Sequence, residues 1–144
     1  ITFDKQTGCM SFYFDKKKLF VSGMEMHLIR IWTNLITNSI KYRKENETLK
    51  IELGVKDDGG DMYKFFVKDN GIGIEEKDFD FIFKLFSRTR TKEVEGTGVG
   101  LPIIKKIINK HGGDIWLDSS LGKGTTFYFT IPKYWGKTIY DRIY

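Results

Sequence analysis

The feature that most restricts the fold of this chain is a pair of alternating segments joined by one polar turn. Apolar residues occupy every second position of residues 49–55, and they do so again over residues 63–67. Aspartates and glycines, which favour reversal of the chain, fill residues 57–61 between them. The pattern predicts a β-hairpin with one apolar face, and a second layer of structure must cover that face.

Two segments with helical periodicity are available to form this second layer. Apolar residues recur at spacings of three and four over residues 24–43 and over residues 101–111, and Gly112-Gly113 ends the second segment. Further strands are predicted at residues 18–22, 115–117 and 125–131, with one or two edge strands within residues 1–14. These elements favour an α/β fold, a two-layer α/β sandwich in which a mixed, mostly antiparallel sheet packs against helices.

The 144 residues suffice for one domain with a substantial core. We expect this domain to span residues 1–132, followed by a tail, residues 133–144, of unassigned role. No stretch approaches the roughly 20 apolar residues of a membrane span, and no signal peptide is recognisable, so we expect no direct membrane contact. The single cysteine, Cys9, excludes an internal disulfide framework and suits a cytoplasmic location. The start at Ile1, without methionine, suggests a fragment of a longer parent.

The net charge of +5 raises the possibility of a nucleic-acid partner. The basic residues are nevertheless dispersed along the chain, and no DNA- or RNA-binding motif accompanies them. We therefore expect a solvated basic surface and no nucleic-acid partner.

Residues 71–100 form a long connection between the predicted hairpin and the second helix. They contain one short amphipathic segment, residues 76–86, which we expect to be helical, and then a polar stretch punctuated by glycine, residues 87–98. Connections of this length inside a compact domain are usually functional. We expect residues 87–98 to act as a lid over a ligand.

The first candidate site is Asp69-Asn70-Gly71-Ile72-Gly73, at the end of the predicted hairpin. Strand parity places Asp69 on the inward face, where an unpaired carboxylate is costly and needs a hydrogen-bond donor. An adenine amino group would supply that donor, and the glycines would let a flat ligand approach the backbone. Taken alone, an ordinary turn at a strand end explains this motif better.

The second candidate site is a set of polar residues on one face of the first predicted helix: Asn34, Asn38, Lys41 and Tyr42. Asn38 lies where a core residue would be expected, and its amide carbonyl is a suitable magnesium ligand. Lys41 can reach a phosphate, and Tyr42 can cover a purine ring. Taken alone, an asparagine bonded to the backbone in the core explains the pattern better.

Two glycine-containing motifs complete the set. Gly96-Thr97-Gly98-Val99-Gly100-Leu101 leads into the second predicted helix, where bare backbone amides form a natural phosphate site or a flexible hinge. The Lys-Ser/Thr ending of a Walker loop is absent. In residues 122–127, Thr125 has inward parity, so we expect its hydroxyl to join the Asp69 end of a pocket, although a plain hairpin turn is the simpler explanation.

Order and spacing together make a stronger signal than any single motif. Over residues 14–132 the chain resembles the GHKL nucleotide-binding superfamily, with its Bergerat fold, and within it the sensor histidine kinases. Their N, G1, F, G2 and G3 boxes are matched by residues 32–42, 69–73, 83–86, 96–101 and 122–127. The resemblance implies ATP with adenine at Asp69, Mg2+ at Asn38, phosphates near Gly98 and Gly100, and Arg88 reaching the γ-phosphate.

The resemblance thus assigns catalytic roles to Asn38 and Arg88, and metal ligation to Asn38. The residues expected to contact the nucleotide are Asn34, Asn38, Lys41, Tyr42, Asp69, Gly71, Gly73, Ile74, Gly96, Thr97, Gly98, Val99, Gly100, Leu101 and Thr125.

One departure separates the chain from hydrolytic members of the superfamily. In DNA gyrase, the mismatch-repair ATPases and the heat-shock chaperone relatives, a glutamate four residues before the magnesium asparagine activates water. Asn34 occupies that position here, and an amide cannot act as a general base. His27 and His111 lie on the two predicted helices, and packing or solvent exposure suits both better than an acceptor role.

The resemblance therefore implies transfer of the γ-phosphoryl group from Mg-ATP to a histidine on a separate dimerisation domain of the parent kinase. A response regulator would be the downstream partner, and the parent is expected to be a homodimer, with or without a membrane anchor. Two alternatives stay open: a protein-serine kinase of the same superfamily, and a nucleotide-sensing module without phosphotransfer.

Overall fold

The computed structural model describes residues 2–4, 9–14, 17–84 and 100–134, which form two sheets and two α-helices. The elements in chain order are β1 (Thr2–Asp4), β2 (Cys9–Phe14), β3 (Lys17–Ser22), α1 (Glu25–Lys41), β4 (Ile51–Lys56), β5 (Met62–Asp69), the 3-10 turns η1 (Glu76–Asp78) and η2 (Phe81–Phe83), α2 (Gly100–Lys110), β6 (Ile115–Ser120) and β7 (Gly124–Pro132). No helix in these ranges is both long and apolar enough to cross a bilayer.

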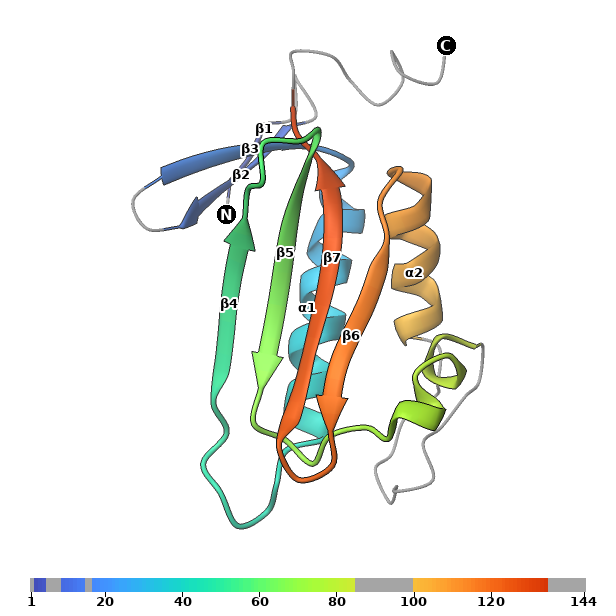
Figure 1. Cartoon of the computed structure of the whole chain (residues 1–144). Coiled ribbons are helices and arrows are strands. Elements are labelled where there is room, and N and C mark those ends of the chain that lie inside the picture. The colour runs from blue at the N-terminus through green and yellow to red at the C-terminus, as the bar shows by residue number, and fades with distance from the viewer. Residues whose placement is uncertain (1, 5–8, 15–16, 85–99, 135–144) are drawn as a thin grey trace.

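The larger sheet has four strands in the order β4-β5-β7-β6, and each neighbouring pair is antiparallel. Both helices lie on one face of this sheet, as Figure 1 shows. The predicted α/β class is therefore confirmed. The sheet was expected to be mixed, whereas every strand pair in the described part of the chain is antiparallel.

The core lies between the helices and the inner face of the four-stranded sheet. Trp32 of α1 packs edge-on against Phe65 of β5 and Phe129 of β7, with ring centroids 5.6 and 5.1 Å away. The two phenylalanine rings stack on each other at 5.4 Å. Each such side chain contributes about 1.5–3 kcal/mol on full burial, so this cluster firmly holds α1 to the sheet.

The sequence accounts for both helices. The buried residues of α1 recur at spacings of one, three and four, and they form one stripe: Leu28, Ile31, Trp32, Leu35 and Ser39. In α2 the matching stripe is Ile104, Ile107 and Ile108. Gly112 ends α2 with φ +81°, and Gly113 N donates to Ile108 O at 3.0 Å, which is a Schellman cap.

The strands expected within residues 1–14 and at residues 18–22 are present as β1, β2 and β3. β1, β2 and β3 form a three-stranded sheet of their own, at the end of the larger sheet where β7 terminates (Figure 1). An antiparallel bridge between Val21 and Lys133 joins the two sheets. Lys133 is buried and ion-paired with Asp57 at 2.6 Å, so the residue that begins the expected tail packs against the domain.

The helix expected over residues 76–86 is not formed within its described part, residues 76–84. Two 3-10 turns, η1 and η2, occupy this stretch, and Ile82 of η2 enters the core. A helix this short gains little from propensity alone, so the burial of its apolar side chains decides its shape.

Candidate functional site

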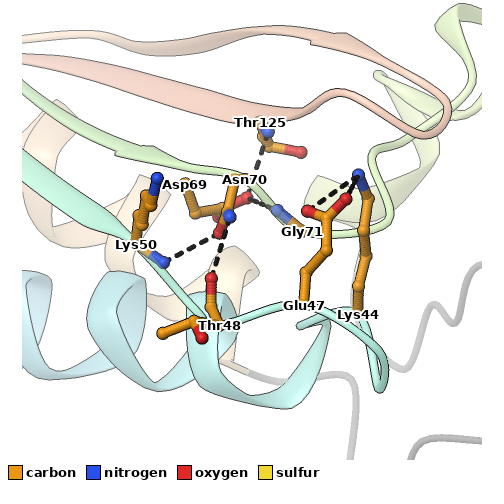
Figure 2. Close-up of polar contacts among 8 residues, drawn as sticks. All are labelled: Lys44, Glu47, Thr48, Lys50, Asp69, Asn70, Gly71 and Thr125. Carbon is orange, nitrogen blue, oxygen red and sulfur yellow. Dashed lines mark hydrogen bonds and ion pairs between the residues drawn. The ribbon is translucent and has the colours of Figure 1, made fainter.

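The candidate site is centred on Asp69, the last residue of β5. Its carboxylate accepts three hydrogen bonds from three different segments of the chain. Gly71 N donates to Oδ1 at 2.9 Å and Thr125 N donates to the same oxygen at 3.1 Å (Figure 2). The hydroxyl of Ser39, on α1, donates to Oδ2 at 2.9 Å. The carboxylate is therefore fixed in orientation at the junction of α1, β5 and β7.

Close backbone contacts account for the glycines around Asp69. A Cβ on Gly71 would collide with the carbonyl oxygen of Tyr42, and a Cβ on Gly73 would collide with that of Ser120. Gly124, at φ +107°, lies directly against the Asp69 carbonyl. We expected Gly71 and Gly73 to admit a ligand to the backbone. In the structure both positions admit other segments of the chain itself.

Backbone hydrogen bonds hold the loop after β5 in place. Ile72 N donates to Tyr42 O at 2.9 Å, and Gly122 N donates to Ile72 O at 2.8 Å. Ile74 N donates to the Ser119 hydroxyl at 2.8 Å. This loop thereby joins the end of α1 to the turn between β6 and β7.

Asn70 ties the same loop to the segment before β4. Its side-chain Oδ1 accepts from Lys50 N at 2.8 Å, and its Nδ2 donates to Thr48 O at 3.0 Å (Figure 2). A nearby ion pair joins Lys44 to Glu47 at 3.4 Å. The Asn70 side chain is thus committed to holding this loop in place.

Thr125 contributes to the site through its backbone. Its side-chain Oγ1 lies 2.8 Å from the hydroxyl of Ser119, which itself donates to Gly124 O at 2.8 Å. We expected the Thr125 hydroxyl to join the Asp69 end of a pocket. In the structure the backbone N–H of Thr125 binds Asp69, and the hydroxyl supports the β6–β7 hairpin.

The polar residues predicted on the first helix lie along α1 and at its end. Asn34 and Asn38 are half-buried, Lys41 is exposed, and Tyr42 is the C-terminal cap residue. A Cβ built on Gly100 would lie 3.2 Å from Asn34 Oδ1, so the Asn34 amide contacts the first residue of α2. Within the described residues, nothing binds the side-chain amide of Asn38.

Several of the expected site residues cannot be placed in the structure. Arg88 and Gly96-Thr97-Gly98-Val99 lie outside the described residues, as does the expected lid. Ile74 and Leu101 are described, and both are partly buried against the hydrophobic core. Among the described residues, no group of three or more histidine, cysteine or acidic side chains is arranged to hold a metal ion.

Two contributing residues were missed by the sequence reasoning. Ser39 follows Asn38 directly and continues the buried stripe of α1, where a polar residue is the signal that could have identified it. Ser119 carried no comparable signal, because its role depends on the pairing of β6 with β7.

The two histidines lie at the other end of α1 from Ser39. His111 is buried, and its ring centroid is 5.9 Å from that of His27. Burial lowers the pKa of His111; the hydrogen bond of Nδ1 to Ile107 O, at 2.7 Å, opposes this shift and His27 adds to it. Met24 N donates to His111 Nε2 at 3.4 Å, which assigns the ring proton to Nδ1.

Comparison with known proteins places this geometry in context. The model of the histidine kinase-, DNA gyrase B- and HSP90-like ATPase family matches residues 23–134. Cyanobacterial phytochrome B of Nostoc sp. is 50% identical over 104 residues, which is 70% of this chain and 14% of that protein. Sensor histidine kinase WalK of Bacillus subtilis is 40% identical over 119 residues, 81% of this chain and 19% of that protein. The chain thus spans less than a fifth of the length of these relatives.

Solved structures with the same fold include the catalytic domain of histidine kinase ThkA in a nucleotide-free form. It is 34% identical, with a TM-score of 0.69, and the match covers 83% of this chain and 74% of ThkA. Full-length ShkA in complex with AMPPNP matches with a TM-score of 0.69 at 27% identity, over 80% of this chain and 23% of ShkA.

Proposed function

Because this chain belongs to the histidine kinase-, DNA gyrase B- and HSP90-like ATPase family, we propose that it binds Mg-ATP and donates the γ-phosphoryl group to a histidine on a separate dimerisation domain of its parent. The parent would be a sensor histidine kinase in two-component signal transduction, since curated relatives such as WalK are sensor histidine kinases. This chain would be its catalytic and ATP-binding domain.

The observation that carries the proposal is the orientation of the Asp69 carboxylate. Three hydrogen bonds from Gly71, Thr125 and Ser39 hold it at the C-terminal end of β5. An exocyclic amine is the matching ligand, because a carboxylate only accepts hydrogen bonds. Adenine carries its exocyclic amine on the ring carbon, C6, where guanine carries a carbonyl, so the site favours ATP over GTP. The AMPPNP complex of ShkA supports an adenine nucleotide as the ligand.

The residues of α1 suit the remainder of a magnesium nucleotide. Asn38 has an uncommitted amide oxygen among the described residues, and Mg2+ accepts such an oxygen together with water and phosphate ligands. Lys41 is exposed one turn further along and can reach a phosphate. When bound, Mg2+ would neutralise negative charge on the transferring phosphoryl group.

The phosphates would lie toward the N-terminus of α2. Backbone N–H groups at a helix start favour anions, and α2 starts at Gly100. Asn34 contacts Gly100, so the first helix meets the second at this point. We propose roles for Gly96-Thr97-Gly98-Val99 and for Arg88 here from the family resemblance.

Phosphotransfer suits this site better than hydrolysis. Asn34 stands where hydrolytic members of the superfamily have a catalytic glutamate, and an amide cannot take a proton from water. His111 is buried and donates to Ile107 O, which leaves the ring poorly placed to attack a phosphate. The acceptor histidine would therefore come from another domain of a homodimeric parent. A response regulator would then receive the phosphoryl group from that histidine. We propose a cytoplasmic location for the domain.

Phosphotransfer in trans would test the proposal. The chain is incubated with Mg-ATP and the parent's histidine-bearing domain, with Asn38→Ala as the matched variant. We expect an acid-labile, base-stable phosphoprotein that Asn38→Ala does not produce. An acid-stable product would indicate a serine kinase, and binding without transfer would indicate a nucleotide-sensing module.

A further inference from the structure

Ser39 is the one side-chain donor to Asp69 among the described residues, and it lies in an unusual place for a hydroxyl. It continues the buried stripe of α1 and is 2% exposed. Its Oγ has two acceptors within reach: Asp69 Oδ2 at 2.9 Å and Leu35 O at 3.3 Å. A hydroxyl has one proton to donate, and the shorter bond to a charged acceptor is the stronger. Ser39 therefore donates to Asp69.

The hydrogen bonds leave the carboxylate with limited capacity. A carboxylate has about four acceptor positions, two on each oxygen. Gly71 N and Thr125 N occupy those of Oδ1, and Ser39 occupies one of those of Oδ2. About one acceptor direction remains, on Oδ2. Ser39 thereby determines the direction from which one more hydrogen-bond donor can bind Oδ2.

We propose that Ser39 is a positioning residue for base selection: its hydroxyl aims the one remaining acceptor direction of Asp69 at the exocyclic amine of the nucleotide. This inference rests on the proposed function, which supplies the adenine ligand. Because Ser39 is buried, it acts through Asp69 and does not itself touch the base.

The position of Ser39 in the chain gives it a second consequence. Ser39 directly follows Asn38, the proposed magnesium ligand, so one turn of α1 holds both the metal-binding amide and the support of the base-binding carboxylate. Removing the hydroxyl should weaken recognition of the amine while the Asn38 position is kept.

The test compares two nucleotides in titration calorimetry: ATP, and purine riboside triphosphate, which lacks the exocyclic amine. We expect Ser39→Ala to weaken ATP binding roughly 5- to 20-fold, since a hydrogen bond to a charged group is lost next to the ligand contact. The affinity of Ser39→Ala for purine riboside triphosphate should stay within about twofold of the wild-type value, because this analogue makes no bond to Asp69. Ser39→Thr, which keeps the hydroxyl, should restore the preference for ATP.

A matched control removes a hydroxyl from the same helix without touching Asp69. Thr37 is exposed and bonds to Thr33 O of its own helix, so Thr37→Ala should leave both affinities unchanged. An equal loss of affinity for both nucleotides in Ser39→Ala would mean that Ser39 has a purely structural role, and it would overturn the inference. Unchanged affinity for ATP would overturn it as well.

A measurement without ligand separates this inference from the proposed function. Amide exchange of Gly71 and Thr125, whose N–H groups bind Asp69, should be several-fold faster in Ser39→Ala because the carboxylate is less constrained. If wild type binds no nucleotide but these amides respond, the proposed function fails and the positioning of Asp69 stands. If wild type selects ATP and the amides do not respond, the role of Ser39 is wrong.

Discussion

Replacement of Asp69 by asparagine should change which purine the site accepts. Oδ1 of Asp69 receives two backbone N–H groups, so the carbonyl oxygen of an asparagine must take that place. Its NH2 group then replaces Oδ2, beside Ser39. The Ser39 hydroxyl can accept from this NH2 and turn its own proton to Leu35 O, 3.3 Å away. We therefore expect Asp69→Asn to remain folded with the backbone contacts intact.

The hydrogen bond that is lost sets the size of the effect on binding. In Asp69→Asn the adenine amine meets a donor where it previously met a charged acceptor. A hydrogen bond to a charged group contributes about 1.5–3 kcal/mol, so ATP should bind roughly 10- to 150-fold more weakly. The same NH2 can donate to a purine carbonyl, so GTP should bind at least as well as it does to wild type.

Calorimetry with ATP and GTP on both chains measures this change as a ratio of affinities. Asp69→Ala is the control, since it removes the acceptor without adding a donor: ATP should weaken and GTP should not improve. Asp69→Ala also leaves the N–H groups of Gly71 and Thr125 without their acceptor, so its stability should fall as well. If Asp69→Asn is folded and its ratio of ATP affinity to GTP affinity equals that of wild type, the base does not bind this carboxylate and the assignment is refuted.

Three further predictions concern other parts of the domain. Gly124→Ala should lower the free energy of unfolding by about 2–4 kcal/mol in chemical denaturation, because φ is +107° and the Asp69 carbonyl fills the space that a Cβ would need. Gly122→Ala is the control: φ is +78° but a Cβ would meet open space, so the free energy of unfolding should fall by about 1 kcal/mol. Burial lowers the pKa of His111 below its ordinary 6.5, so as pH falls the unfolded chain takes up a proton at His111 before the folded chain does. Stability should therefore decline as pH falls below about 6.5, and His111→Gln should flatten that part of the curve of stability against pH. Asn38→Ala should abolish phosphotransfer in trans yet keep the preference for ATP over GTP; loss of both would contradict separate metal and base sites.

The sequence predicted most of the fold because its signals are local. Alternation over residues 49–55 and 63–67 placed the hairpin, and the three-four spacing placed both helices within a few residues of their observed ends. Strand parity also put Asp69 on the inward face, where its three donors converge. Period and parity were sufficient here because each depends only on neighbours along the chain.

The features that were missed depend on contacts between distant segments. Whether β1, β2 and β3 join the main sheet or form their own is decided by pairing across the molecule, which no local pattern encodes. The role of Ser39 depends on Asp69, thirty residues away in the chain. The Thr125 hydroxyl turned to Ser119 for the same reason, since the β6–β7 register sets these two residues opposite each other.

The glycines of the family motifs show why loss of binding in a variant needs careful interpretation in this chain. Gly71, Gly73 and Gly124 each stand where a neighbouring carbonyl leaves no room for a side chain. A substitution at any of them displaces backbone before it affects a ligand, so reduced nucleotide binding would follow from a damaged fold. Asp69 and Ser39 can instead be changed by a single group, in Asp69→Asn and Ser39→Ala, while the Gly71 and Thr125 N–H groups keep an oxygen acceptor. Their variants therefore report on recognition of the base, and the glycine variants report on the assembly of the site.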